Sequence, residues 1–202
     1  MSVKNQFKGK QIVIGVTGSI AAYKAAEIVS YLSQQGANIT VVMTAGAAKF
    51  VTPLTFQTLS HSKVITDLFS ADYEFDPPRN NRDGVYPAIG GAAAPQHIAL
   101  AEKLSALLIA PASGNIIGKI ASGIADDALT TLVMSVKASR VIIAPAMNER
   151  MYLNPIVQDN IKRLKKQGYH FIEPAKGHLA CGSGIGRLAD FDTIITYLSK
   201  KV

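Results

Sequence analysis

Residues 140–152 read RVIIAPAMNERMY, and this stretch decides the fold of the chain. Residues 141–144 are apolar and mostly β-branched, which is typical of a strand that is buried on both faces. Pro145 ends the predicted strand because proline cannot donate a hydrogen bond to a sheet ladder. We therefore expect the functional chemistry to begin where this strand stops.

Asn148 follows the predicted strand directly and stands at the start of a predicted helix. Its side-chain amide carries donors and acceptors, so it can hold a carboxylate without itself being charged. Asn is also a favoured N-cap residue, and this segment read in isolation favours the capping role. Both interpretations stay open at this point.

The same alternation of strand and helix runs along the chain. Strands are predicted at 11–16, 38–43, 106–110, 141–144 and 169–172, with a weak one at 64–65, and helices at 20–35, 97–104, 126–136 and 192–200 and after residues 53 and 115. Such alternation implies right-handed crossovers and a largely parallel sheet covered on both faces. The expected fold is a single α/β domain over residues 1–202, doubly wound in three layers, Rossmann-like or flavodoxin-like.

Residues 70–95 interrupt this pattern with a segment rich in Asp, Pro, Arg, Asn and Gly. The segment is long for a loop inside a compact domain. We expect it to be flexible, and to act as a lid or as a surface arm used in assembly.

Composition excludes several classes of protein. The single cysteine, Cys181, excludes an internal disulfide and a metal site built from several cysteines. No apolar run reaches the roughly 18 residues of a membrane span, and residues 1–10 lack a signal-peptide core, so a cytoplasmic protein with no membrane contact is expected. The net charge of +7 fits a solvated face or attraction of phosphorylated ligands better than nucleic-acid binding.

Three predicted strand-to-helix turns consist of small residues, several with hydroxyl groups: TGS at 17–19, TAG at 44–46 and SGN at 113–115. Such turns meet at the carboxyl edge of a parallel sheet, where backbone N–H groups and helix N-termini can approach a phosphate. Loop sterics would explain one such turn, but three at one edge favour a ligand. The chain has neither G-x-G-x-x-G nor G-x-x-x-x-G-K-[ST], so one phosphate, as in FMN, suits it better than NAD or a nucleoside triphosphate.

Several segments together carry a resemblance to a known family. They are TGSIAAYK at 17–24, His97 with Ile98, APASGNIIGKIASGIADDALTT at 110–131, PAMN at 145–148 with Met151, and LACG at 179–182 with Gly186 and Arg187. In these segments the chain resembles the flavin-dependent cysteine decarboxylases, a family that includes the phosphopantothenoylcysteine decarboxylases of coenzyme A synthesis. The resemblance covers nearly the whole chain outside residues 70–95.

The resemblance implies an FMN-dependent enzyme that decarboxylates 4'-phosphopantothenoylcysteine to 4'-phosphopantetheine by thiol oxidation, CO2 loss and reduction of the enethiol. The implied FMN contacts are Gly18, Ser19, Ile20, Thr44, Ala45, Ser113, Gly114, Asn115, Ile116 and Ala146. The implied catalytic residues are His97, which takes the thiol proton, Asn148, which holds the substrate carboxylate, and Cys181, an acid on a glycine-rich flap. Met151, His178, Leu179 and Ala180 would join Asn148 around the substrate, and no metal site is expected.

The resemblance also implies partners: a homo-oligomer, a trimer or a multiple of trimers, with FMN at subunit contacts. The ligase that makes the substrate would be a separate polypeptide. Tyr152 stands where the family usually has Trp, Ile116 where Thr is common, and Ser105 where Asp is usual.

Two alternative functions share the flavin site. One is a peptidyl-cysteine decarboxylase of peptide modification, and the other is a non-catalytic, flavoprotein-like regulatory subunit. A prenylating flavin enzyme would leave Asn148 and Cys181 without a role.

Overall fold

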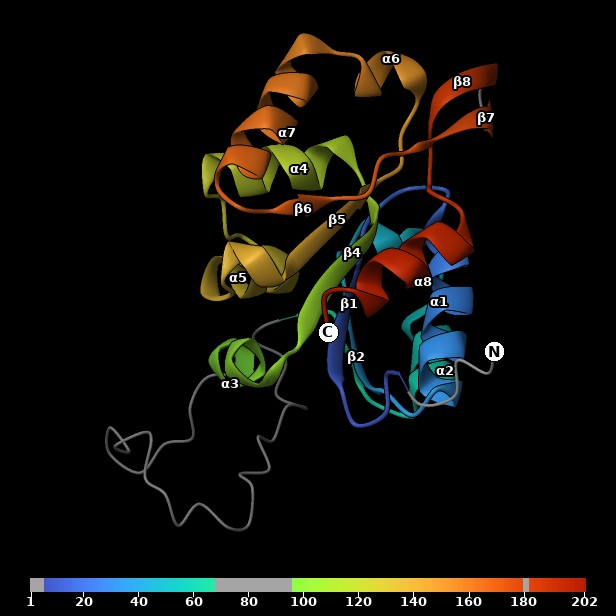
Figure 1. Ribbon diagram of the computed structural model, residues 1–202, viewed down its shortest axis with the longest axis vertical. Helices are drawn as coiled ribbons and strands as arrows, with labels where there is room; N and C mark the ends of the chain where they lie inside the picture. The colour runs from blue at the N-terminus through green and yellow to red at the C-terminus, as the bar shows by residue number, and fades with distance from the viewer. Residues whose placement is uncertain (1–5, 68–95, 180–181) are drawn as a thin grey trace.

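A six-stranded parallel sheet forms the centre of the computed structural model, which describes residues 6–67, 96–179 and 182–202 (Figure 1). Its strands are β1 (Gln11–Val16), β2 (Asn38–Met43), β3 (Val64–Ile65), β4 (Ala106–Ala112), β5 (Val141–Pro145) and β6 (His170–Phe171). The order is β3-β2-β1-β4-β5-β6, and every neighbouring pair is parallel. This is the Rossmann order and not the flavodoxin order. Successive strands are added outward from β1 on one side and outward from β4 on the other, so the switch point lies between β1 and β4.

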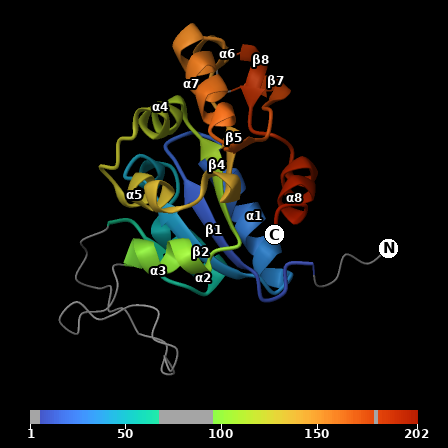
Figure 2. The ribbon, with the colours of Figure 1, turned by 60° about the vertical axis from the view of Figure 1, so that its left-hand side comes forward.

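Helices cover both faces of the sheet, which confirms the doubly wound α/β prediction (Figures 1 and 2). One face carries α1 (Ala22–Gln34), α2 (Pro53–Ser60) and α8 (Phe191–Ser199), and the other carries α3 (Gln96–Lys103), α4 (Gly114–Ser122), α5 (Ala128–Ser135) and α7 (Pro155–Lys166). Short helical turns are η1 (Ala47–Lys49), η2 (Ala138–Arg140) and α6 (Glu149–Tyr152). The segment at 70–95 lies outside the described residues.

Successive residues of a strand point to opposite faces, and the core follows that rule. In β1, Ile12 and Ile14 pack into the core beneath α1 and α8, while Val13 packs into the core beneath α4 and α5. All five residues of β5 are buried, as its run of apolar residues predicts. Both faces of the strand therefore need apolar side chains.

A separate antiparallel hairpin of β7 (Ala175–Leu179) and β8 (Gly182–Arg187) follows the main sheet. The expectation that residues 169–172 form the last strand was therefore wrong. The sequence does not indicate this hairpin, because the segment is rich in glycine and glycine is depleted in strands. Gly177 and Gly186 adopt φ values of 153° and 131°, which side-chain-bearing residues rarely reach. The segment expected to be a loose flap begins and ends as paired strand.

The basic residues at 162–166 lie on the exposed side of α7, whereas Ile161 and Leu164 on the same helix are buried. Lys165 pairs with Glu173 at 2.6 Å. This pattern is the solvated face expected from the sequence. Among the described residues, no helix is both long enough and apolar enough to cross a bilayer.

Candidate functional site

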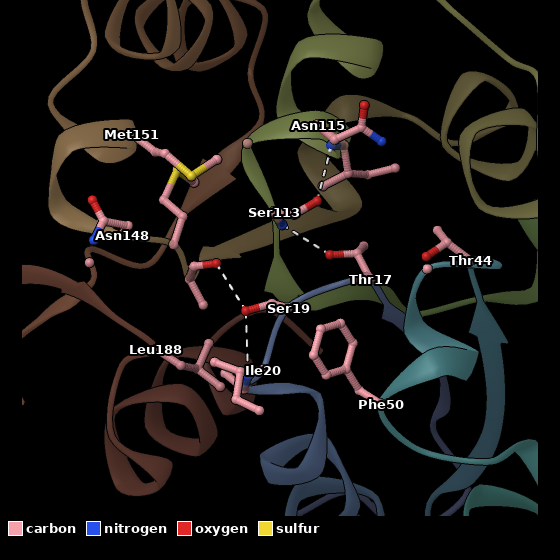
Figure 3. A pocket seen from close by; sticks show the side chains of 18 of the residues that line it. Thr17, Ser19, Ile20, Thr44, Phe50, Ser113, Asn115, Asn148, Met151 and Leu188 are labelled. Carbon is pink, nitrogen blue, oxygen red and sulfur yellow. Dashed lines mark hydrogen bonds between the residues drawn. The ribbon is translucent and has the colours of Figure 1, made fainter. Parts of the chain in front are cut away.

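A pocket of about 880 Å³ opens at the carboxyl edge of the sheet, where β1, β2, β4 and β5 end (Figure 3). Its walls come from the turns after these four strands, from α1, α4 and α6, and from the β7–β8 hairpin. The predicted site residues among its lining are Gly18, Ser19, Ile20, Thr44, Ala45, Ser113, Gly114, Asn115, Ile116, Ala146, Asn148, Met151 and His178. The structure thus brings most of the predicted site together.

Two hydroxyl groups tie the turns around the pocket to one another. The buried Thr17 hydroxyl donates to the Pro111 carbonyl oxygen at 2.7 Å and accepts from the Ser113 N–H at 2.9 Å. The Ser19 hydroxyl donates to the Ala146 carbonyl oxygen at 3.2 Å. The turns after β1, β4 and β5 are therefore fixed relative to each other by the protein itself (Figure 3).

The first two turns approach each other closely, and glycine fits this contact without displacing either backbone. A Cβ atom on Gly18 would lie 3.2 Å from the backbone of Gly46, tighter than nearly all such contacts. The absence of side chains here leaves the backbone of both turns open to the pocket. This is the arrangement expected where a phosphate is held by backbone N–H groups.

The N-terminus of α4 also faces the pocket. Ser113 caps this helix, and its hydroxyl accepts from the Ile116 N–H at 3.3 Å. The first turn of α4 contains no acidic residue, so the positive end of the helix dipole is not offset there. An anionic group is favoured at this end of the pocket.

Apolar side chains line the pocket beside the small-residue turns. Ile20, Phe50 and Met151 are 58%, 50% and 51% exposed although they line the pocket, and Leu188 joins them (Figure 3). Exposed apolar groups of this size favour contact with a flat, apolar ligand or with another protein surface. Together with the phosphate-binding turns, they fit the ring and the phosphate of FMN.

Lys119 lines the pocket but is neutralised locally. Its ammonium group lies 2.7 Å from the Asp126 carboxylate and 3.7 Å from that of Asp127. The hydrogen bond with Asp126 raises the pKa of Lys119 and lowers the pKa of Asp126. Asp127 also caps α5 through a capping box with Thr130, so it lies at the start of the helix predicted at 126–136.

The other two cations of the pocket differ from each other. Arg187 pairs with Asp190 at 2.7 Å, although its buried Nε has no hydrogen-bond partner among the described residues. Lys24, half-buried in α1, forms no ion pair with any acidic residue in the described part of the chain. Lys24 is therefore the cation most available to an anionic ligand.

Asn148 caps α6, which confirms the capping interpretation. Its side-chain oxygen accepts from the Arg150 N–H at 2.9 Å. Its side-chain NH2 donates to no residue that the structure describes, and Asn148 lines the pocket on the same side as Met151 (Figure 3). Capping uses the acceptor only, so the donor is free for a ligand.

The structure does not describe the side chains of the remaining predicted residues. His97 belongs to α3, which leads into the start of β4 and lies at the other edge of the sheet (Figure 1). Leu179 ends β7, and Ala180 and Cys181 lie outside the described residues. No group of acidic, histidine or cysteine side chains suited to a metal ion occurs within the described ranges.

The pocket contains residues that sequence reasoning did not assign. Thr17, Ala21, Tyr23, Lys24, Gly46, Phe50, Lys119, Asp127, Met147, Gly186, Arg187 and Leu188 line it as well. Thr17 and Gly46 belong to the turns predicted at 17–19 and 44–46, and Lys24 and Arg187 lie inside the segments that carry the family resemblance, which could have pointed to them. Phe50 stands outside those motifs and had no comparable signal.

The Rossmann-order sheet and the small-residue turns at its carboxyl edge define a mononucleotide-binding protein of the flavin type. The family model described as Flavoprotein matches residues 1–202, and the chain belongs to that family.

Two curated relatives span different lengths. The chain is 40% identical to the "Probable phosphopantothenoylcysteine decarboxylase" of Streptococcus mutans, over 96% of this chain and 99% of that protein. It is 45% identical to the "Coenzyme A biosynthesis bifunctional protein CoaBC" of Borreliella burgdorferi, over 93% of this chain and 43% of that protein. The chain therefore spans less than half the length of the bifunctional relative.

Two solved structures share the fold closely. A cysteine-to-serine mutant of PPC decarboxylase complexed with pantothenoylaminoethenethiol matches with a TM-score of 0.77 and 26% identity, over 95% of this chain and 97% of the other. The FMN-dependent cysteine decarboxylase SpaF matches with a TM-score of 0.75 and 27% identity, over 96% and 97%.

Proposed function

We propose that this chain catalyses the FMN-dependent decarboxylation of 4'-phosphopantothenoylcysteine to 4'-phosphopantetheine. The observation that carries the proposal is the position of Asn148, whose free amide donor lies at a pocket built from phosphate-binding turns. Similarity over almost the full length of a probable phosphopantothenoylcysteine decarboxylase supports the same reaction.

FMN, when bound, supplies the two-electron chemistry that makes loss of CO2 from a saturated carbon feasible. The turns after β1, β2 and β4 would hold its phosphate and ribityl chain, and Ala146 would lie by the ring. The Asn148 amide would donate to the substrate carboxylate. Because this amide is neutral, it orients the carboxylate without the strong ground-state stabilisation that a lysine or arginine would give.

The phosphate of the substrate needs a cation that the protein has not already paired. Lys119 is held by Asp126 and Asp127, whereas Lys24 has no ion pair within the described ranges. Lys24 would therefore recognise the phosphate of the substrate. A peptide substrate has no phosphate, so this feature favours the phosphopantothenoyl substrate over a peptidyl-cysteine.

A complete site would need a second copy of the chain. Helix α3, which carries His97, lies at the amino-terminal ends of the strands, whereas the pocket lies at their carboxyl-terminal ends (Figure 1). Ile20, Tyr23 and Phe50 leave exposed apolar surface around the pocket, which suits a subunit contact. We therefore place His97 of one copy at the pocket of another, in a trimer or a multiple of trimers.

The remaining roles stay predictions. These are the acid role of Cys181, enclosure of the substrate by Leu179 and Ala180, a separate ligase polypeptide, a lid or arm at 70–95, and a cytoplasmic location. The non-catalytic regulatory subunit would bind FMN but would not turn over substrate.

Absorbance and competition test the proposed function. Purified protein loaded with FMN should be yellow and should release CO2 from 4'-phosphopantothenoylcysteine. Phosphopantothenate derivatives should inhibit this release, while peptides that end in cysteine should not. Inhibition by the peptides alone would favour a peptidyl-cysteine decarboxylase, and a protein that cannot be loaded with FMN would contradict the proposal.

A further inference from the structure

Strand β8 of the hairpin is attached directly to the segment that follows β5. The Met147 N–H donates to the Gly186 carbonyl oxygen at 3.0 Å. Two residues later, the Glu149 carboxylate accepts from the Ile185 N–H at 2.9 Å. One backbone bond from Met147 and one side-chain bond to Glu149 thus join β8 to the segment that leads into α6.

The contact is tight on both sides. A Cβ atom on Gly184 would overlap the Glu149 carboxylate, and one on Gly186 would overlap the Met147 carbonyl oxygen. Gly186 has a positive φ, but Gly184 is not among the glycines with positive φ. At position 184 the Glu149 carboxylate fills the space that a side chain would take, so a side chain there would have to displace that carboxylate.

The two elements that Glu149 joins form neighbouring parts of the pocket wall. Asn148 precedes Glu149 in the chain, while His178, Gly186 and Arg187 line the pocket from the hairpin. Glu149 is half-buried and forms no ion pair with any residue in the described part of the chain. Its oxygen therefore acts on the hairpin backbone and does not serve a surface ion pair.

We propose that Glu149 is a positioning residue, whose carboxylate fixes β8 against α6 so that substrate meets Asn148 and the hairpin in one geometry. This inference rests on the proposed decarboxylase function. A hydrogen bond from a backbone N–H to a carboxylate is among the stronger ones in proteins, and its loss leaves the Ile185 N–H without this acceptor. The hairpin wall would then sample more positions, and substrate would bind more weakly.

Steady-state kinetics of two substitutions test the role. Glu149→Ala should raise the substrate KM by about tenfold, with the amount of bound FMN unchanged, because it removes the acceptor. Glu149→Gln keeps an acceptor oxygen and should stay within about threefold of the unaltered chain. The exposed Asp159→Ala on α7 is the matched control and should leave KM unchanged. An unchanged KM in Glu149→Ala, or an equal rise in Glu149→Gln, would overturn the proposal.

A double-mutant cycle tests the contact itself. Gly184→Ala should raise KM on its own, because its methyl group displaces the Glu149 carboxylate. In the Glu149→Ala background the same methyl group should have little further effect, because the two residues share one contact. Independent, additive effects would overturn the proposed contact.

Hydrogen exchange separates failure of this inference from failure of the proposed function. Peptides that cover residues 182–187 should exchange faster in Glu149→Ala than in the unaltered chain, and no faster in Glu149→Gln. This readout needs no substrate, so it holds even if the chain releases no CO2. Unchanged exchange in an active Glu149→Ala enzyme would refute the role of Glu149 and leave the decarboxylase proposal standing.

Discussion

Asn148 combines two roles that a single substitution can separate. Its side-chain oxygen caps α6, while its NH2 group is the donor that we assign to the substrate carboxylate. Asn148→Asp keeps a capping acceptor but puts a second carboxylate where the substrate carboxylate should bind. We expect this variant to fold and to bind FMN, with CO2 release reduced by at least about 100-fold because two like charges meet in a pocket.

The chain provides a matched control for this substitution. Asn154 caps α7 in the same way, with its oxygen accepting from the Ile156 N–H at 2.9 Å, and it does not line the pocket. Asn154→Asp should leave CO2 release unchanged. Near-normal turnover in Asn148→Asp would refute the assignment of the substrate carboxylate.

Lys24 provides a test of substrate choice at the scale of one residue. Lys24→Met keeps most of the side-chain volume and removes the charge. The KM for 4'-phosphopantothenoylcysteine should rise by about tenfold, since a partly buried pair with a phosphate contributes on the order of 1–2 kcal/mol. The KM for pantothenoylcysteine without phosphate should not change. The exposed Lys162→Met on α7 is the control, and equal effects on both substrates would contradict the phosphate role of Lys24.

Glu173, in the loop between β6 and β7, joins helices α6 and α7 near the site. The Tyr152 hydroxyl of α6 donates to one carboxylate oxygen of Glu173 at 2.9 Å, and Lys165 of α7 donates to the other at 2.6 Å. Burial, with the bond to Glu173, raises the pKa of Tyr152 to about 12. Burial opposes ionisation of Glu173, but the bonds from Lys165 and Tyr152 outweigh it and lower the pKa of that carboxyl.

This network predicts a pH-dependent stability. A carboxyl group whose pKa is lower in the folded state stabilises the fold above its unfolded pKa, and this contribution is lost as the pH falls through the folded pKa. Glu173→Gln should therefore lower the melting temperature near pH 7, and the difference should shrink below about pH 4. Thermal unfolding at several pH values measures this. The exposed Glu102→Gln on α3 is the control, and a difference independent of pH would contradict the ionic role.

The elements of the main sheet could be predicted from sequence because their burial dictates their composition. Residues 141–144 are apolar since both faces of β5 are covered, and Pro145 marks its end. The hairpin could not be predicted in this way. Gly177 and Gly186 both have positive φ values, and Gly186 also lies against the Met147 carbonyl oxygen, and such requirements leave no periodic pattern.

The residues of the site can also be separated into those that the sequence predicts and those that it does not. The turns at 17–19, 44–46 and 113–115 could be predicted because backbone approach to a phosphate restricts their residue types. Phe50 and Leu188 enter the pocket through the path of the chain after η1 and after β8, and an apolar residue alone carries no such signal. The contact between Glu149 and the hairpin joins residues that are far apart in the sequence, so no local sequence pattern indicates it.

At the scale of the whole molecule, the strand order brings four turns to one edge of the sheet and leaves α3 at the other. If His97 and Asn148 of one site come from different copies, two inactive variants should complement each other. His97→Asn and Asn148→Asp chains, each inactive alone, should regain CO2 release when coexpressed. Mixed oligomers without activity would contradict a site shared between copies.

Every role assigned to these residues serves one reaction at the pocket between Asn148 and the small-residue turns. The most direct test measures CO2 and 4'-phosphopantetheine together, with FMN-loaded protein, 4'-phosphopantothenoylcysteine and no added reductant. We predict equal amounts of both products over many turnovers, because the electrons removed from the substrate are returned to it. Bound FMN without release of CO2, or release that requires an external reductant, would contradict the account.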